Sequence, residues 1–328
     1  MKNLILAASL LFAPLPALAA QVGPFTEFLV FGDSLSDPGN VFFDLTGTPI
    51  PLPQFYPTGQ FTDGNNWAVQ LGATFESGTN FARGWAKAAT DPTLINREPV
   101  PGFNISGYDS VDFADQIGLF RDAVNNGLQT GNRPVASIMF GGNDLRDANS
   151  QAELLAAMQA AIEAISYGIT ELMGDGLNDF LVLGLPDLGR LPEVPDPVTA
   201  AALTQASFLF NTELRSELAR LPSSANVMYV DTFGIFAPLF DDPAAYGFVN
   251  STDACLPALL GGFVNDCTGF VFYDDVHPTE AMHAILAEAV RDTLEAAPAA
   301  VPLPAGGVLI LTAFGGLVLV GRRRMHGI

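Results

Sequence analysis

Four short, mostly apolar runs alternate along the chain with longer segments whose apolar residues recur at helical spacing. The runs cover residues 28–31, 135–140, 180–183 and 227–230, and each is followed by Gly or Asp. Continuous apolar runs of this length are typical of parallel strands that are buried on both faces. The pattern therefore predicts four core strands with a turn at the end of each.

Helical spacing covers the segments between these runs. The predicted helices span residues 111–124, 150–173, 199–221 and 279–296, and Ser150 with Glu153 forms a capping box ahead of the second. Strands that alternate with helices predict an α/β fold with a mostly parallel sheet covered on both faces. Residues that follow the strands, including Ser34 and Asn143, should then gather at one edge of the sheet.

Two stretches lack either periodicity and are predicted to be irregular. Residues 42–61 are rich in Pro, Gly and aromatic residues, and residues 235–273 contain both cysteines and several Phe residues. Long loops at a catalytic edge usually shape the substrate pocket, although packing over the core explains any single aromatic residue equally well. The aromatic residues in these stretches that suit the wall of an apolar pocket are Phe42, Phe43, Phe55, Phe236 and Phe240.

The N-terminus has the pattern of a secretory signal peptide. Lys2 precedes the apolar run from Leu4 to Leu18, and small residues follow at Ala19 and Ala20. This pattern predicts a signal peptide over residues 1–20, which is removed on export. The catalytic domain is expected to span residues 25–298.

The C-terminus carries a second targeting pattern. Residues 301–305 read Val-Pro-Leu-Pro-Ala, an apolar stretch follows, and three arginines end the segment at Arg324. The segment over 301–324 resembles the VPLPA form of the PEP-CTERM sorting signal. That resemblance implies a Gram-negative bacterium, a sorting protease as a partner, and transient anchoring in the inner membrane. A plain tail anchor is the alternative, because an arginine cluster stays cytoplasmic.

The charge and the cysteines narrow the expected partners. The formal net charge is −21, so the surface repels nucleic acid and anionic lipid headgroups, and contact with a membrane is expected only through the C-terminal segment. Cys255 and Cys267 are the only cysteines, and an exported chain is expected to join them in a disulfide. With three histidines and two cysteines, the chain offers no obvious metal site, and no cofactor is expected.

The candidate chemistry lies in three short segments. Ser34 stands in a Gly-Asp-Ser-Leu-Ser turn, Asn143 in Gly-Gly-Asn-Asp, and Asp274 three residues before His277. A serine hydroxyl needs an adjacent base to attack an ester; His277 can supply it, with Asp274 fixing the imidazole tautomer. Asn143 can donate its amide to the developing oxyanion. Taken singly, these residues could equally be a turn serine, a capping asparagine and a structural histidine.

The spacing differs from that of the usual α/β-hydrolase elbow, Gly-x-Ser-x-Gly with a distant acid. Instead, the chain resembles the GDSL lipase/esterase family of SGNH hydrolases over about residues 27–297. The matching blocks are residues 31–40, 56–64, 78–84, 141–144, 184–189 and 274–278. The blocks occur in the family's order, which makes the resemblance far more specific than any one of them.

The resemblance implies a three-layer α/β/α, flavodoxin-like fold. It implies Ser34 as nucleophile, His277 as base and Asp274 as its partner. The oxyanion hole would combine the Ser34 backbone N–H, the Asn143 amide and a backbone N–H of the block that begins at residue 78, here called the second block. That block departs from the family pattern, because Trp85 stands where relatives often have a glycine; Gly84 is therefore the candidate donor.

These residues predict a secreted serine esterase or lipase that forms an acyl-enzyme. Its substrate would be a small-molecule, lipid or acylated glycan ester, and its address the periplasm, the cell surface or the medium. A polysaccharide O-acetyl esterase of the same fold is one alternative. A non-catalytic surface or matrix protein on a retired hydrolase fold is the other, and an ester turnover assay separates the two classes.

Overall fold

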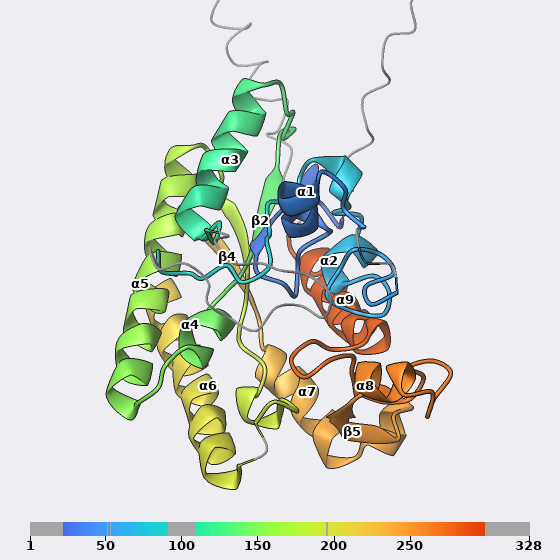
Figure 1. Cartoon of the computed structure of the whole chain (residues 1–328). Helices are drawn as coiled ribbons and strands as arrows, with labels where there is room; N and C mark the ends of the chain where they lie inside the picture. Colours follow the sequence, from blue (N-terminus) through green and yellow to red (C-terminus); the bar gives the residue numbers. More distant parts are fainter. Residues whose placement is uncertain (1–21, 51, 53, 91–108, 195, 299–328) are drawn as a thin grey trace, which may run out of the picture. The chain divides into compact units, whose positions relative to one another are not determined.

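The computed structural model describes residues 22–298 except 51, 53, 91–108 and 195 (Figure 1). The chain divides into two units, residues 1–296 and 297–328, and the description below concerns the first. The predicted signal peptide (1–20) and sorting segment (301–324) lie outside the described residues. Among the described helices, none combines the length and apolar character needed to cross a membrane.

A four-stranded parallel sheet forms the centre of this unit. Its strands lie side by side in chain order, with Phe28 paired to Val135 in the first pair. β1 and β3 are buried along their whole length, as continuous apolar runs predict. The strands are β1 (Glu27–Gly32), β2 (Pro134–Met139), β3 (Asp179–Leu183) and β4 (Asn226–Val230), which confirms the four predicted strands.

A short segment continues the sheet beyond β1. The Val30 N–H donates to the Thr79 carbonyl at 2.9 Å and the Phe81 N–H donates to the Val30 carbonyl at 2.7 Å, which makes a parallel bridge at Asn80. The extended segment at Asn80 follows β1 in the chain and lies on one side of it, while β2 lies on the other side. Flavodoxin-like sheets have the same order, and their ligands bind where the strand order reverses. Here that point lies between β1 and β2.

Helices cover both faces of the sheet (Figure 1). On one face α5 packs against α3 and α6, and on the other α2 packs against α9. The predicted three-layer α/β/α architecture is confirmed. These helices are α3 (Phe113–Asn125), α5 (Gln151–Gly174), α6 (Pro197–Leu218), α2 (Trp67–Gln70) and α9 (Glu280–Glu295).

The two stretches predicted to be irregular contain further short elements, so that prediction is wrong in part. α7 is apolar around most of its circumference and holds Pro238, which hides its helical period; the Asp231 side chain caps it by accepting from Gly234 N–H. The remaining helices and strands are α1 (Asn40–Thr46), α4 (Gly142–Arg146), α7 (Thr232–Asp241), α8 (Cys255–Leu260), β5 (Asn250–Ala254) and β6 (Phe270–Phe272). Within the described residues, 3-10 turns lie at η1 (Phe75–Ser77), η2 (Leu188–Arg190) and η3 (Pro243–Tyr246).

The disulfide lies in a second, smaller core. Cys255 and Cys267 are bonded, with 5.5 Å between their Cα atoms, and both are buried. They belong to a cluster with Phe42, Tyr56 and Phe61, which links the loop after β1 to the segment before the catalytic Asp/His pair. The aromatic loop residues therefore serve largely as packing between loops.

Candidate active site

The nucleophile candidate sits on a tight turn at the end of β1. A side chain at Gly32 would meet the Ser36 Oγ at 2.9 Å, so only glycine fits where the strand bends. The Asp33 carbonyl accepts from the Ser36 and Asp37 N–H groups at 3.0 Å, and the Asp33 carboxylate accepts from Leu35 N–H. This turn leaves Ser34 half-buried at the carboxyl edge of the sheet.

Ser34, His277 and Asp274 form one continuous hydrogen-bonded chain. His277 Nε2 lies 2.8 Å from Ser34 Oγ, and His277 Nδ1 lies 2.8 and 2.9 Å from the two Asp274 oxygens. These contacts set the imidazole so that it can take the serine proton while the carboxylate holds the other ring nitrogen. The structure thus brings together the three residues predicted to act as a triad.

The Asp274 carboxylate is held by its own turn. It accepts from the backbone N–H groups of Val276 and His277 at 2.9 and 2.7 Å, and from the Tyr56 hydroxyl at 3.1 Å. Burial raises the pKa of Asp274, but the nearby His277 and these hydrogen bonds outweigh burial and hold the pKa below its ordinary value. The Asp274 carboxylate is therefore ionised at neutral pH, where it can stabilise the imidazolium of His277.

Two aromatic residues complete this side of the site, and sequence reasoning did not assign them a role. The Phe61 ring lies 5.1 Å from the His277 ring, and the Tyr56 hydroxyl donates to Asp274. Burial, then the Asp274 charge, raises the pKa of Tyr56, so the hydroxyl stays protonated and donates. Both residues lie in the block at 56–64, so the family resemblance was the signal available.

Asn143 opens α4 after the left-handed Gly141, and its amide is held from two sides. Its Nδ2 donates to the Ala86 carbonyl at 2.9 Å, and its Oδ1 accepts from Arg146 Nη1 at 3.2 Å. Glu193 holds that guanidinium with contacts of 2.6 and 2.7 Å. Since Nδ2 carries two hydrogens, one remains for a substrate oxygen.

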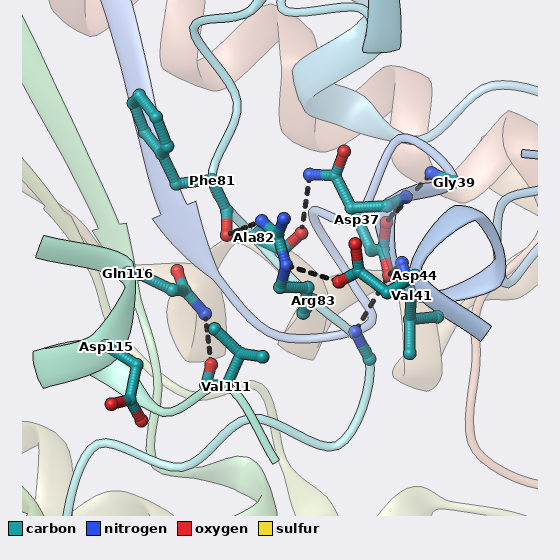
Figure 2. A network of polar contacts seen from close by, with 12 residues as sticks. Asp37, Gly39, Val41, Asp44, Phe81, Ala82, Arg83, Val111, Asp115 and Gln116 are labelled. Atoms are coloured by element: carbon teal, nitrogen blue, oxygen red, sulfur yellow. Dashed lines mark hydrogen bonds and ion pairs between the residues drawn. The ribbon is translucent and has the colours of Figure 1, made fainter. Parts of the chain in front are cut away.

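The second block does not present Gly84 as predicted. Its N–H donates to Asp37 Oδ2 at 2.8 Å, and the same buried carboxylate accepts from Gly39, Asn40 and Val41 N–H groups at 2.8, 2.6 and 3.2 Å (Figure 2). An N–H turned toward a buried carboxylate is not turned toward a substrate. We therefore do not assign Gly84 to the oxyanion hole. The Ser34 N–H, by contrast, has no backbone acceptor among the described residues.

Trp85 holds a backbone conformation that side chains rarely adopt. Its φ of 65° lies in the left-handed region, where relatives often have glycine, and it is the only such non-glycine residue in the described part of the chain. Its ring meets the Phe61 ring edge-on at 5.4 Å. The Trp85 ring therefore packs on the aromatic residue that itself lies against His277.

Two buried carboxylates lie close to the triad without belonging to it. Burial raises the pKa of Asp33 and of Asp144 to about 6. Asp144 accepts from the Ala88 and Ala89 N–H groups at 3.0 Å, which ties the turn that carries Asn143 to the segment just after Trp85. Among residues 22–298 as described, no cluster of His, Cys, Asp and Glu side chains has the composition of a metal site.

An apolar pocket opens beside Ser34 and Asn143. Phe236 and Phe240 line it as predicted, together with Phe272, Met282 and Leu286. Its volume is about 60 Å³.

The other three aromatic residues predicted for the pocket do not line it. Phe42 is buried in the cluster around the disulfide, and Phe55 packs against the same cluster. Phe43 is 44% exposed and contacts Phe75. They pack the neighbouring loops instead, which was the alternative for each of them.

The fold and this geometry define an α/β protein with a Ser–His–Asp site of the serine-hydrolase class. The chain belongs to the GDSL-like lipase/acylhydrolase family, whose model matches residues 28–290. It is a carboxylic ester hydrolase.

Two curated relatives illustrate the range of the family. The chain is 28% identical to a GDSL esterase/lipase of Arabidopsis thaliana, over 82% of this chain and 86% of that protein. It is 23% identical to a phosphatidylcholine-sterol acyltransferase of Aeromonas hydrophila, over 83% and 90%. A solved α/β hydrolase from the metagenome of Lake Arreo aligns with a TM-score of 0.42 at 15% identity, over 84% of this chain and 96% of that one.

Proposed function

We propose that this chain is an exported serine esterase that cleaves short-chain carboxylic esters through an acyl-enzyme on Ser34. The observation that carries the proposal is the 2.8 Å contact between Ser34 Oγ and His277 Nε2 at the mouth of an apolar pocket. A nucleophile and its base in hydrogen-bond contact, with the base held by a carboxylate, is the arrangement that acyl transfer needs.

In the first half-reaction, Ser34 Oγ attacks the ester carbonyl while His277 Nε2 takes its proton. Asp274 stabilises the imidazolium through Nδ1, and Tyr56 and two backbone N–H groups stabilise that carboxylate in turn. The Ser34 N–H and the free Asn143 amide hydrogen donate to the oxyanion. Collapse expels the alcohol, which takes the proton from His277.

In the second half-reaction, water attacks the acyl-serine with His277 again as base. The new bond joins the water oxygen to the acyl carbon, and the proton returns through His277 to Ser34 Oγ as the ester bond to serine breaks. The products are the free acid and the restored serine. No step requires a cofactor.

The size of the pocket supports a short acyl group. The pocket leaves a space of about 60 Å³ for the centres of water-sized groups, so it is small. The lining is mostly apolar, with Phe236, Phe240 and Leu286 on its walls. An acyl chain of a few carbons fills this space, whereas a long lipid chain requires the walls to move.

A polysaccharide O-acetyl esterase is the second candidate, because an acetyl group is the smallest acyl group that such a pocket accepts. The C-terminal resemblance to a sorting signal favours it, since that sorting system accompanies exopolysaccharide production. We also propose export through residues 1–20 and surface delivery, or transient anchoring, through residues 301–324.

Turnover of a graded ester series tests the proposal. Purified mature protein is assayed on p-nitrophenyl esters from acetate to palmitate and on an O-acetylated polysaccharide, with Ser34→Ala as the matched control. We expect kcat/KM to peak at two to four acyl carbons and to vanish in the control. Equal rates for both proteins would contradict catalysis at Ser34, and a maximum at long chains would contradict the short-chain assignment.

A further inference from the structure

His283 is a buried histidine for which the triad chemistry has no use. It lies in the first turn of α9, where its backbone N–H donates to the Thr279 carbonyl at 2.9 Å, and only 2% of the residue is exposed. Its side chain lines the apolar pocket between Met282 and Leu286. His277, not His283, makes the contacts with Ser34 and Asp274.

The imidazole of His283 lacks the partner that a buried polar group normally has. Its Nδ1 is buried and has no hydrogen bond to any described residue. A buried polar atom left unpaired is costly, and such atoms in native structures call for an explanation. For an imidazole that lines a substrate pocket, the missing partner can be a polar group of the substrate.

The His283 ring is neutral at neutral pH. Burial, with a smaller contribution from the neighbouring His277, lowers the pKa of His283 to about 3. A neutral imidazole offers one N–H donor and one lone-pair acceptor. A hydroxyl group can pair with either ring nitrogen, because it can donate to the lone pair or accept from the N–H. A plain alkyl chain leaves the imidazole unpaired.

We propose that His283 forms a polar subsite in the acyl pocket and selects esters whose acyl group carries a hydroxyl. This inference rests on the proposed function and deepens it from short acyl esters to short hydroxyacyl esters. His283 acts by hydrogen bonding alone and takes no part in bond breaking. It is a specificity residue, because a site with an unpaired polar group disfavours the analogue that lacks the matching hydroxyl.

The test compares esters that differ by a single oxygen. The kcat/KM values for ethyl 2-hydroxybutyrate and ethyl 3-hydroxybutyrate are each divided by the value for ethyl butyrate, with acid release followed by titration. Wild-type protein should favour at least one hydroxy ester. In His283→Leu that ratio should fall about five- to tenfold, the size of one hydrogen bond. His283→Asn, which keeps a donor and an acceptor, should retain part of the preference.

Met282→Leu is the matched control, since Met282 lines the same pocket without a hydrogen-bonding group; its ratio should equal that of the wild type. Each ratio removes the general effect of repacking the pocket on turnover. An unchanged ratio in His283→Leu, or no hydroxy preference in the wild type, would mean that His283 holds only a buried water, and would overturn the proposal.

A binding measurement separates this proposal from the esterase proposal. Calorimetry with 3-hydroxybutyrate, 2-hydroxybutyrate and butyrate on Ser34→Ala should show the same preference, and adding His283→Leu should remove it. If no ester were hydrolysed but this preference persisted, the esterase proposal would fail and the subsite would stand. If ethyl butyrate were hydrolysed and the preference were absent, only the subsite would fail.

Discussion

The turns that carry Ser34 and Asn143 and the loop that carries Asp274 and His277 are anchored in different ways. The two turns continue directly from buried parallel strands of the central sheet. Buried carboxylates then hold them, as Asp37 shows by accepting from four backbone N–H groups. Asp37 is fully buried, and this burial raises its pKa to about 6.

The loop of the Asp/His pair has much less of the sheet beneath it. It follows the short strand β6, whose partner β5 is partly or fully exposed along its length. The disulfide and the aromatic cluster with Tyr56 and Phe61 pack this region. One backbone hydrogen bond, from Glu193 N–H to the Asp275 carbonyl at 3.1 Å, joins it to the loop after β3.

The difference explains how a loop can carry a catalytic base. The Asp274 carboxylate and the His277 imidazole fix one another inside a single turn, so their mutual geometry does not depend on the sheet. Among the hydrogen bonds of the described residues, the one between His277 and Ser34 joins the nucleophile turn directly to the Asp/His turn. We therefore expect catalysis to be most sensitive to substitutions at that contact and least sensitive to loss of the disulfide.

The largest effect is expected where the two regions meet. Ser34→Ala and His277→Ala should each lower kcat by about 10⁶, and the double variant should be little worse, because the residues act as one unit. Steady-state kinetics with circular dichroism checks this and controls for folding. If the losses of kcat in the two single variants multiplied in the double variant, Ser34 and His277 would act independently, which would contradict their role as one unit.

An intermediate effect is expected on the sheet side alone. Asn143→Ala should lower kcat by about 10²–10³ and change KM little, because its hydrogen bond strengthens as the oxyanion develops. Saturation curves of the purified variant separate the two constants. A change confined to KM would make Asn143 a substrate-binding or capping residue instead.

The smallest effect on activity is expected on the loop side. Replacing Cys255 and Cys267 by Ala should destabilise the protein by up to about 3 kcal/mol, for a closed loop with a sequence separation of 12. The rate below the melting temperature should stay within about a factor of two, because the Asp/His turn holds itself. A large loss of kcat in folded protein would show that the disulfide positions His277.

The sequence predicted those parts of the fold that depend on local pattern. The ends of the four strands and the four long helices agree with the structure to within about three residues. For α6, the predicted start at residue 199 lies two residues after the observed start at Pro197, which Asp196 caps. The triad was also within reach, because Asp274 and His277 share one turn. The short apolar helix α7 could not be predicted, because its sequence pattern lacks a polar face.

What escaped prediction depends on long-range contacts. Nothing local shows that Asp37 takes the Gly84 N–H across 47 positions of sequence, so Gly84 was a reasonable but unsupported donor. In the same way, the Tyr56 hydroxyl reaches Asp274 across 218 positions. Which aromatic residues face the pocket depends on how two loops fold. Phe240 therefore lines the pocket, whereas Phe43 is exposed elsewhere.

The central claim is that Ser34 becomes acylated, and a covalent trap tests it most directly. Mature protein is treated with a p-nitrophenyl alkylphosphonate, and intact mass and peptide mapping then locate the label. We predict one phosphonyl group per chain on Ser34, none in Ser34→Ala, and much slower labelling in His277→Ala. Stoichiometric labelling of another residue, or full ester turnover by protein labelled at Ser34, would contradict it.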